Sequence, residues 1–251
     1  MNPDLQLALA LADAADAITM RAYQSDTLAV RTKADRTPVS EADEATERML
    51  RERLAAERPG DGVVGEEFGT TGPSARRWIL DPIDGTKNYI RGVPVWATLI
   101  ALEEAGVVTV GLISAPALGR RWWAARGEGA FANARRIHVS TTASLRDAFF
   151  SYDSITDSDK KESAGQLLTL VRSCGRTRAF GDFWSHMLVA EGAIDVAFEP
   201  TVALWDVAPI QVIVEEAGGR FTDLAGHARA DGGSAIATNG LLHDQVLEIL
   251  R

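Results

Sequence analysis

Two acidic residues stand three positions apart in the segment Trp78-Ile-Leu-Asp-Pro-Ile-Asp-Gly-Thr86. Asp81 and Asp84 follow the apolar run 78–80, which is typical of a buried strand. Pro82 fixes one backbone angle and lacks an amide donor, so the turn between the two acids is stiff. Carboxylate oxygens are hard ligands that suit divalent cations. This spacing predicts a cation site at the end of a strand.

A short helix is predicted directly after the second acid, from Gly85-Thr86 through Tyr89. The free amides at a helix N-terminus favour an anion. A divalent cation and a phosphate group could therefore bind in the same place.

The elements that position this segment follow from hydrophobic periodicity and turn residues. Before residue 141 we expect helices at 4–24 and from Ser40 onward, a polar loop at 33–39, and strands at 63–64, 78–80, 96–102, 107–114, 120–125 and 129–132. Ser40 and Asp43 have the spacing of a capping box at the start of the second helix.

From about residue 141, strands and helices alternate. We expect strands at 148–152, 177–180, 194–198, 220–222 and 235–238, and helices at 162–173, 182–191, 205–217 and 241–250. The fold class is therefore α/β, with an α+β first part (1–140) and an α/β second part (141–251) in one compact unit, whose sheets are covered by helices.

Composition excludes several classes of protein. The chain has 251 residues, of which 46% are hydrophobic, and a formal charge of −9 without a Lys/Arg-rich run, which argues against nucleic-acid binding. Cys174 stands alone, so no intrachain disulfide is possible. The first twenty residues lack the basic start of a secretory signal, and no apolar run reaches transmembrane length. We expect a cytoplasmic protein with neither nucleic-acid nor membrane partners.

Further acids lie beside turns or helix starts. Glu66 follows a strand, Glu199 ends one, and Asp43 and Asp206 each fall in the first turn of a helix. Taken singly, each has a structural explanation, because Asp43 completes a cap and Asp206 complements a helix dipole. The pair of acids at 81 and 84 is the more specific signal.

Three segments, in this order and spacing, resemble the motifs of the inositol monophosphatase superfamily of metal-dependent, lithium-sensitive phosphatases: Gly65-Glu66-Glu67, Asp81-Pro-Ile-Asp84-Gly-Thr86 and Trp205-Asp206-Val-Ala-Pro209. The resemblance extends over essentially the whole chain, and segments 87–98 and 180–190 are most similar to the histidinol-phosphate phosphatase branch. It implies a layered α-β-α-β-α sandwich of the inositol monophosphatase and fructose-1,6-bisphosphatase type. Members of this superfamily commonly form homodimers.

The resemblance also implies a set of metal ligands. Glu66, Asp81 and the main-chain carbonyl of Ile83 would hold one Mg2+, and Asp81, Asp84 and Asp206 would hold a second. Like charges about 4 Å apart repel by roughly 4 kcal/mol at an effective dielectric near 20, so four converging carboxylates require cations. Two divalent ions balance them, and a third, weaker ion could enter with the phosphate.

The implied reaction is hydrolysis of a phosphate monoester by a water that the metal activates. Glu66 and Thr86 would orient this water, with the Thr86 hydroxyl bonded to Asp43. The amides of Gly85 and Thr86 would bind phosphate oxygens. Lys33 either approaches the phosphate or is a surface lysine.

Recognition of the leaving group rests on other residues. Glu199 lies seven residues before Asp206, where the superfamily places a carboxylate that contacts the non-phosphate part of the substrate. It could pair with the ammonium or the imidazole of histidinol phosphate. Asp182 is either a second such carboxylate or the N-cap of the following helix. Arg178 is a further candidate.

The favoured function is a histidinol-phosphatase of histidine biosynthesis. An inositol-1-phosphate or broad sugar-phosphate phosphatase is the first alternative, and a catalytically silent phospho-ligand-binding regulator is the second. The intact catalytic acids argue against the regulator, and the net charge of −9 argues against a two-metal nuclease. The histidines lack metal-ligand spacing and are interpreted as structural: His138, His186, His227 and His243.

Overall fold

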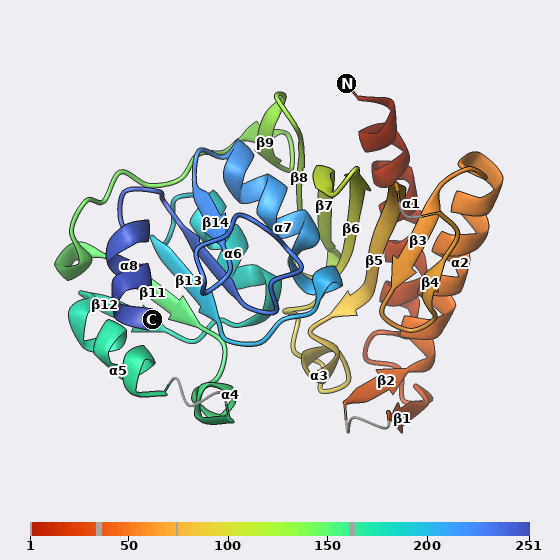
Figure 1. Cartoon of the computed structure of the whole chain (residues 1–251). Helices are drawn as coiled ribbons and strands as arrows, with labels where there is room; N and C mark the ends of the chain where they lie inside the picture. The colour runs from red at the N-terminus through yellow and green to blue at the C-terminus, as the bar shows by residue number, and fades with distance from the viewer. Residues whose placement is uncertain (1, 34–36, 74, 161–163) are drawn as a thin grey trace.

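The computed structural model describes residues 2–33, 37–73, 75–160 and 164–251, and Figure 1 shows the arrangement of their helices and strands. The larger sheet has eight strands in the order β10-β9-β8-β7-β6-β5-β3-β4, and the smaller has five in the order β12-β11-β13-β15-β14. The larger sheet contains β3 (Gly62–Gly65), β4 (Gly69–Thr71), β5 (Arg76–Asp84), β6 (Ala97–Glu104), β7 (Val107–Ala115), β8 (Arg120–Ala125), β9 (Gly129–Ala132) and β10 (Arg135–Arg136). The smaller contains β11 (Phe149–Tyr152), β12 (Arg176–Arg178), β13 (Val196–Glu199), β14 (Arg220–Thr222) and β15 (Ala235–Thr238).

The helices form layers around these sheets. They are α1 (Pro3–Ala22), α2 (Glu41–Glu57), α3 (Thr86–Tyr89), α4 (Ile155–Lys160), α5 (Ala164–Ser173), α6 (Asp182–Ala190), α7 (Leu204–Glu216) and α8 (His243–Leu250). In Figure 1, α1 and α2 cover the outer face of the larger sheet, α6 and α7 lie between the sheets, and α5 and α8 lie on the far side of the smaller sheet. The expected α-β-α-β-α layering is therefore confirmed.

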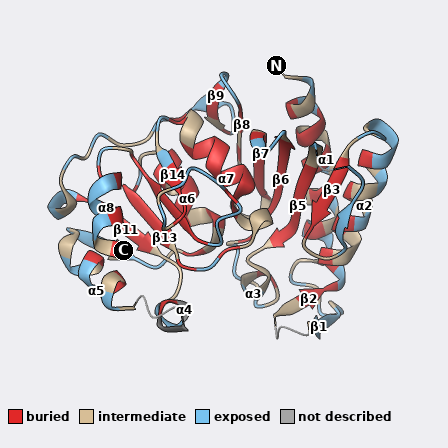
Figure 2. Ribbon diagram, viewed as in Figure 1, coloured by how far each residue is buried: buried red, intermediate tan, exposed pale blue. Residues whose placement is uncertain are grey.

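Burial on both faces explains why the middle of β5, residues 78–80, is a continuous apolar run. Trp78 and Leu80 pack against α1 and α2, whereas Ile79 faces the core shared with α6 and α7. Successive side chains of a strand point to opposite faces, so both faces of this strand are buried. Figure 2 shows the same burial through the centre of the larger sheet. Each fully buried Leu or Ile contributes about 1.5–3 kcal/mol.

Several sequence-based boundaries are corrected. The predicted polar loop 33–39 is partly wrong, because Pro38–Ser40 forms β2, which pairs antiparallel with β1 (Val30–Thr32). The strand predicted at 177–180 is instead Arg176–Arg178, and α4 was not predicted. Positions 34–36 of the predicted loop and 162–163 of the predicted helix lie outside the described residues. Two short 3-10 helices, Pro116–Leu118 and Leu145–Asp147, complete the elements of the described chain.

The two sheets divide along the chain near residue 140. The larger is built from residues before that point and the smaller from residues after it, while α6 and α7 pack against both. The division into parts 1–140 and 141–251 stays a prediction.

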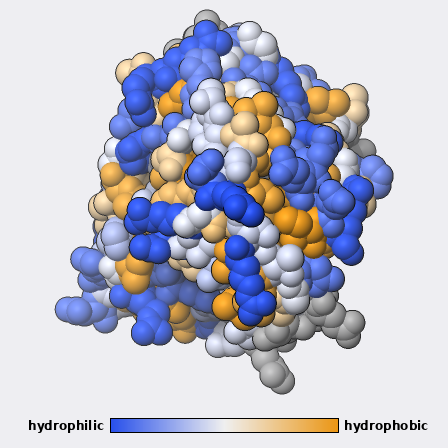
Figure 3. Space-filling model, turned by 90° about the vertical axis from the view of Figure 1, so that its left-hand side faces the viewer, coloured by the Kyte–Doolittle hydropathy of each residue, from blue (hydrophilic) through white to orange (hydrophobic). Residues whose placement is uncertain are grey.

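Figure 3 shows no wide apolar face on the described residues in this view. Small hydrophobic patches alternate there with hydrophilic ones. The exposed large hydrophobic residues come from many elements: Met20, Val30, Phe68, Val93, Val107, Ile155, Leu168 and Leu241. Scattered residues of this kind are ordinary on soluble folds. Within the described chain, every helix is too short or too polar to cross a membrane.

Candidate active site

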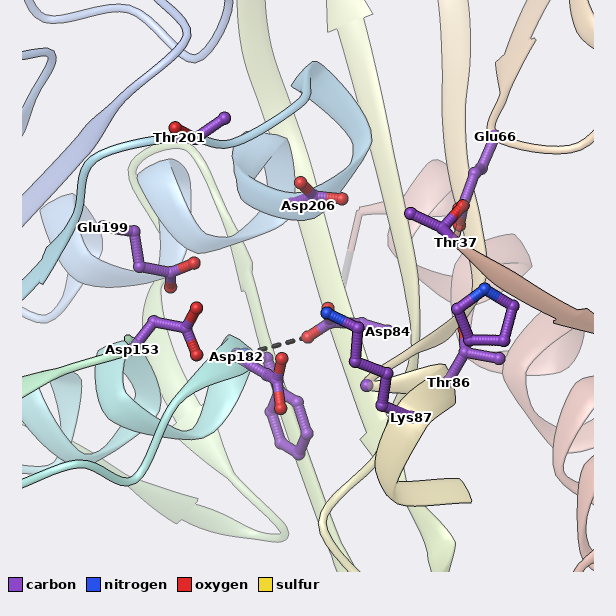
Figure 4. Close-up of a pocket in the computed structure, with 13 residues that line it drawn as sticks. Thr37, Glu66, Asp84, Thr86, Lys87, Asp153, Asp182, Glu199, Thr201 and Asp206 are labelled. Carbon is purple, nitrogen blue, oxygen red and sulfur yellow. Dashed lines mark hydrogen bonds between the residues drawn. The ribbon is translucent and has the colours of Figure 1, made fainter. Parts of the chain in front are cut away.

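An acidic cavity opens where the end of β5 meets the N-termini of α3, α6 and α7 (Figure 4). Its volume is about 290 Å³. The residues that line it are Thr37, Pro38, Glu66, Asp84, Gly85, Thr86, Lys87, Asp153, Asp182, Phe183, Glu199, Thr201 and Asp206. These residues come from β2, β5 and β13, from the starts of α3, α6 and α7, and from connecting segments, so only the complete fold forms the cavity.

Three carboxylates converge beside this cavity, and two of them, Asp84 and Asp206, line it. Asp81, Asp84 and Asp206 each offer an oxygen atom within 4.8 Å of the others. A regular strand would point Asp81 and Asp84 to opposite faces, because they are an odd number of residues apart. Against β6, however, Asp81 pairs with Leu99 and Asp84 pairs with Ala97, so β5 holds one extra residue there. This β-bulge brings both acids to the same side.

Backbone amides hold the three carboxylates in place. The amide of Ile83 donates to Asp81 Oδ1 at 3.0 Å, and the amide of Phe183 in α6 donates to Asp84 Oδ2 at 2.8 Å. The amide of Ala203 donates to Asp206 Oδ2 at 2.7 Å at the start of α7. The helix-start role that the sequence suggested for Asp206 is therefore real, and it coexists with its place in the acidic group.

The electrostatics of this group call for a cation. Burial raises the pKa of Asp81 well above its usual range, and the charges of Glu66, Asp84 and Asp206 raise it further. Burial also raises the pKa of Asp84, with Asp182 and Asp206 adding to the effect. The pKa of Asp206 rises to about 7, first through burial and then through Glu199 and Glu66. Mg2+ prefers oxygen ligands such as these carboxylates, and it would balance their negative charge. The residues present therefore fit a divalent ion.

Glu66 lies beside this group rather than within it. Its Oε1 accepts a hydrogen bond from Lys33 Nζ at 2.7 Å, and the same ammonium contacts Glu67 Oε1 at 2.6 Å. Although burial opposes it, these bonds raise the pKa of Lys33. Lys33 is thus no solvated surface lysine, and its partners here are the two glutamates. Glu66 nonetheless acts on Asp81 as its strongest charged neighbour.

Thr86 and Asp43 form the expected pair. The Thr86 hydroxyl is 3.3 Å from Asp43 Oδ1 and 2.9 Å from the carbonyl oxygen of Ile83, and it can donate to either. Gly85 precedes α3 with φ of 80°, which glycine adopts without strain. Asp43 also closes the capping box, because Ser40 donates its amide to Asp43 Oδ2 at 2.8 Å. Burial raises the pKa of Asp43 to about 6.

A second acidic group lies across the cavity. Figure 4 shows Asp153, Asp182 and Glu199 projecting into the same space. Burial raises the pKa of Asp182 to about 7, followed by the charges of Glu199 and Asp153. The alternative that Asp182 is an N-cap is wrong, because Gly181 occupies that position and Asp182 begins α6 with φ of 48°. Asp182 Oδ2 accepts a hydrogen bond from Asn88 Nδ2 at 3.0 Å.

Sequence reasoning missed several residues in or beside the cavity, and three of these have ionisable side chains. Asp153 directly follows β11, and an acid at the end of a buried strand was the available signal. Lys87 lines the cavity one position after Thr86. His186 is buried and lies 2.8 Å from Glu199 Oε1 through its Nε2 atom, which no spacing in the sequence indicates.

One candidate is not brought to the cavity. Arg178 is exposed on β12, and its guanidinium donates to the carbonyl oxygen of Thr177 at 2.8 Å. The residues that line the cavity do not include it.

Of the other histidines, His243 is buried between the hydroxyls of Thr222 and Thr238, at 2.9 and 3.0 Å. Burial lowers the pKa of His243 to about 4, so it packs as a neutral ring.

Comparison with known proteins agrees with this geometry. Residues 1–251 match the pattern of the inositol monophosphatase family. The chain is 53% identical to the histidinol-phosphatase of Streptomyces coelicolor, covering 98% of this chain and 96% of the relative. It is 54% identical to the histidinol-phosphatase of Mycobacterium tuberculosis, covering 98% and 97%.

Solved structures show the same architecture. The extragenic suppressor protein suhB of Bartonella henselae superposes with a TM-score of 0.92 at 30% identity, covering 100% of this chain and 99% of that one. An IMPase of Thermotoga maritima gives a TM-score of 0.89 at 31% identity, covering 99% and 97%. With its bulged acidic pair, its layered sheets and a family match over its whole length, the chain belongs to the inositol monophosphatase family.

Proposed function

We propose that this protein is a Mg2+-dependent phosphate monoester hydrolase that converts L-histidinol phosphate to L-histidinol in histidine biosynthesis. The observation that carries the proposal is one cavity flanked by two acidic groups. Asp81, Asp84 and Asp206 form the group suited to a cation, and Asp153, Asp182 and Glu199 form a separate group. Identity above 50% to two histidinol-phosphatases supports the same substrate.

Two Mg2+ ions, with a third entering alongside the phosphate, would be held by Glu66, Asp81, the carbonyl of Ile83, Asp84 and Asp206. When bound, the ions supply positive charge to the phosphate and lower the pKa of the attacking water. They also explain how a chain of charge −9 binds an anionic substrate. Because the superfamily is lithium-sensitive, lithium is expected to inhibit.

The chain's own groups place the water and the phosphate. The Thr86 hydroxyl donates its hydrogen bond to Asp43 or to the Ile83 carbonyl, so the lone pairs of Thr86 Oγ1 remain available to accept a hydrogen bond from a water. Glu66 would orient the same water by accepting a hydrogen bond from it. The amides of Gly85 and Thr86 at the start of α3 would hold phosphate oxygens, and Lys33 would stay near the phosphate through its bond to Glu66.

The second acidic group suits the leaving group of this substrate. Histidinol carries an ammonium and an imidazole, and both bind carboxylates when protonated. Asp182 and Glu199 would receive them, with Asp153 adding a further negative charge to the same space. A sugar or inositol has no cation to offset the repulsion among these three carboxylates, so this acidic group favours the cationic substrate. Arg178 lies outside this contact in the described chain.

A substrate panel tests the proposal. One preparation is assayed for phosphate release from histidinol phosphate, inositol-1-phosphate and fructose-1,6-bisphosphate, with Mg2+ and with EDTA. We expect the highest kcat/KM on histidinol phosphate and no release in EDTA, and Asp84→Asn serves as the inactive control. Higher efficiency on inositol-1-phosphate would favour the sugar-phosphate alternative, and no release from any substrate would favour a silent regulator.

Assembly and location are also proposed. Because homodimers are common in the superfamily, we infer that the protein acts as a homodimer. We also infer that it acts in the cytoplasm, where histidine biosynthesis takes place. Size-exclusion chromatography with light scattering tests the first inference, and cell fractionation tests the second.

A further inference from the structure

Helix α2 carries a second buried acid one turn after Asp43. Glu47 has none of its surface exposed, and it does not line the cavity. It belongs neither to the metal-ligand set nor to the groups that contact the phosphate in the proposed function. A fully buried carboxylate is costly unless it is bonded on every side, so its partners indicate what it is for.

The partners of Glu47 are the backbone of the turn that carries Glu66. Glu47 Oε2 accepts the amide of Glu67 at 2.7 Å, and Glu47 Oε1 accepts the amide of Phe68 at 3.2 Å. These are the two residues that follow Glu66 in the tight connection from β3 to β4. Hydrogen bonds from backbone amides to a charged acceptor are stronger than those to neutral ones.

Arg51, one turn further along α2, closes the arrangement. Its Nε donates to Glu47 Oε1 at 2.7 Å, and its terminal nitrogens reach Thr71 Oγ1 at 3.1 Å and the carbonyl oxygen of Gly69. The planar guanidinium thus joins Glu47 to β4, on the far side of the turn. The turn and the strand that follows it are therefore held by the same helix.

Gly65 shows how closely the turn sits on this carboxylate. A Cβ atom at this position would lie 2.0 Å from Glu47 Oε1, a distance that no side chain tolerates. The glycine before Glu66 therefore permits the backbone to rest against Glu47. The close approach is a property of the backbone, which fixes where the Glu66 side chain begins.

We propose that Glu47 is a positioning residue that sets the β3–β4 turn so that Glu66 stays beside Asp81. Asp43 and Glu47 are four residues apart on one face of α2. Asp43 holds Thr86, and Glu47 holds the turn of Glu66. One rigid helix thereby fixes the relative positions of both groups that orient the water. This inference rests on the role of Glu66 in the proposed function.

The test compares Glu47→Gln with Glu57→Gln. Glutamine keeps the shape of Glu47, but its amide nitrogen must face either the Glu67 amide or both the Phe68 amide and Arg51, so at least one donor loses its acceptor. Glu57 forms the other Glu–Arg pair at this spacing in α2, with Arg53, and its side chain is 42% exposed. The metal-free proteins are titrated with Mg2+ by calorimetry, and kcat, KM and the melting temperature are measured on the same samples.

For Glu47→Gln we expect the Mg2+ dissociation constant to rise at least tenfold. We also expect kcat at saturating substrate to fall about tenfold, KM to change less than twofold, and raised Mg2+ to restore part of kcat. Glu57→Gln should match the wild type. A lower melting temperature with Mg2+ affinity and kcat within twofold of the wild type would overturn the inference, because Glu47 would then only stabilise the fold.

Two further arms keep the outcome decisive. If Glu47→Gln does not fold, Arg51→Lys retains a cation beside Glu47 and loses the fork that reaches β4, so a threefold or larger loss of Mg2+ affinity is expected and no loss overturns the inference. The calorimetric arm needs no substrate, so an error in the assigned substrate leaves it intact. Absence of Mg2+ binding by the wild type would refute both the metal site and this inference.

Discussion

Replacing one carboxylate of the cation site should make the metal-free protein more stable while weakening its response to Mg2+. In Asp206→Asn the side chain keeps its shape. Its amide oxygen can still accept a hydrogen bond from the Ala203 amide, which lies 2.7 Å from Asp206 Oδ2 in the wild type. What disappears is a negative charge that burial, Glu199 and Glu66 disfavour. The substitution removes this cost only where the wild-type carboxyl would be ionised.

The size of the effect follows from the pKa. A carboxyl whose pKa rises from 3.8 in the unfolded chain to about 7 in the folded one loses about 4 kcal/mol of folding stability as the pH rises through that interval. The cost is fully present above the folded pKa and is absent below the unfolded one. At pH 8 we therefore expect up to about 4 kcal/mol in favour of Asp206→Asn, and less than about 2 kcal/mol at pH 5. Water and counter-ions in the cavity make these upper bounds.

The assay is urea unfolding in EDTA at both pH values, repeated without EDTA in about 10 mM Mg2+. This concentration is chosen to exceed the dissociation constant of the site roughly a hundredfold. Asp231→Asn is the control, because Asp231 is exposed and its pKa is lowered by a hydrogen bond from Arg229. Magnesium should stabilise the wild type more than Asp206→Asn. The reasoning is refuted if Asp206→Asn is the less stable protein in EDTA at pH 8, or if Mg2+ stabilises both proteins equally.

Three other outcomes are expected. Thr86→Val removes the hydroxyl that contacts Asp43, so kcat should fall roughly 100-fold or more in a phosphate-release assay, with near-normal thermal unfolding; unchanged kcat would contradict its role. Glu199→Gln should raise KM for histidinol phosphate about tenfold, a loss of roughly one charged contact, and leave inositol-1-phosphate almost unaffected; equal effects on both substrates would argue against a cationic leaving group. Phe150→Ala empties a fully buried site in the smaller sheet and should cost about 3–5 kcal/mol by urea unfolding, without changing KM of the folded fraction.

Much of the fold was predictable because hydrophobic periodicity is local. The hairpin of β6 and β7, the capping box at Ser40 and the short α3 each follow from neighbouring residues. The helix α4 and the pairing of β1 with β2 were not predicted, since short polar segments carry little periodic signal.

For the site, the sequence by itself determined which residues have the chemistry: the acids at 81 and 84, a helix start after them, and an acid at 206. Only the tertiary structure decided their geometry. Four features of the site depend on contacts beyond the local sequence. These are the bulge in β5, the contact of His186 with Glu199, the position of Arg178 outside the cavity, and the hydrogen bond from the turn after Glu66 to Glu47. Side-chain type is written locally, whereas the direction in which a side chain points is set by long-range packing and hydrogen bonding, which one sequence does not display.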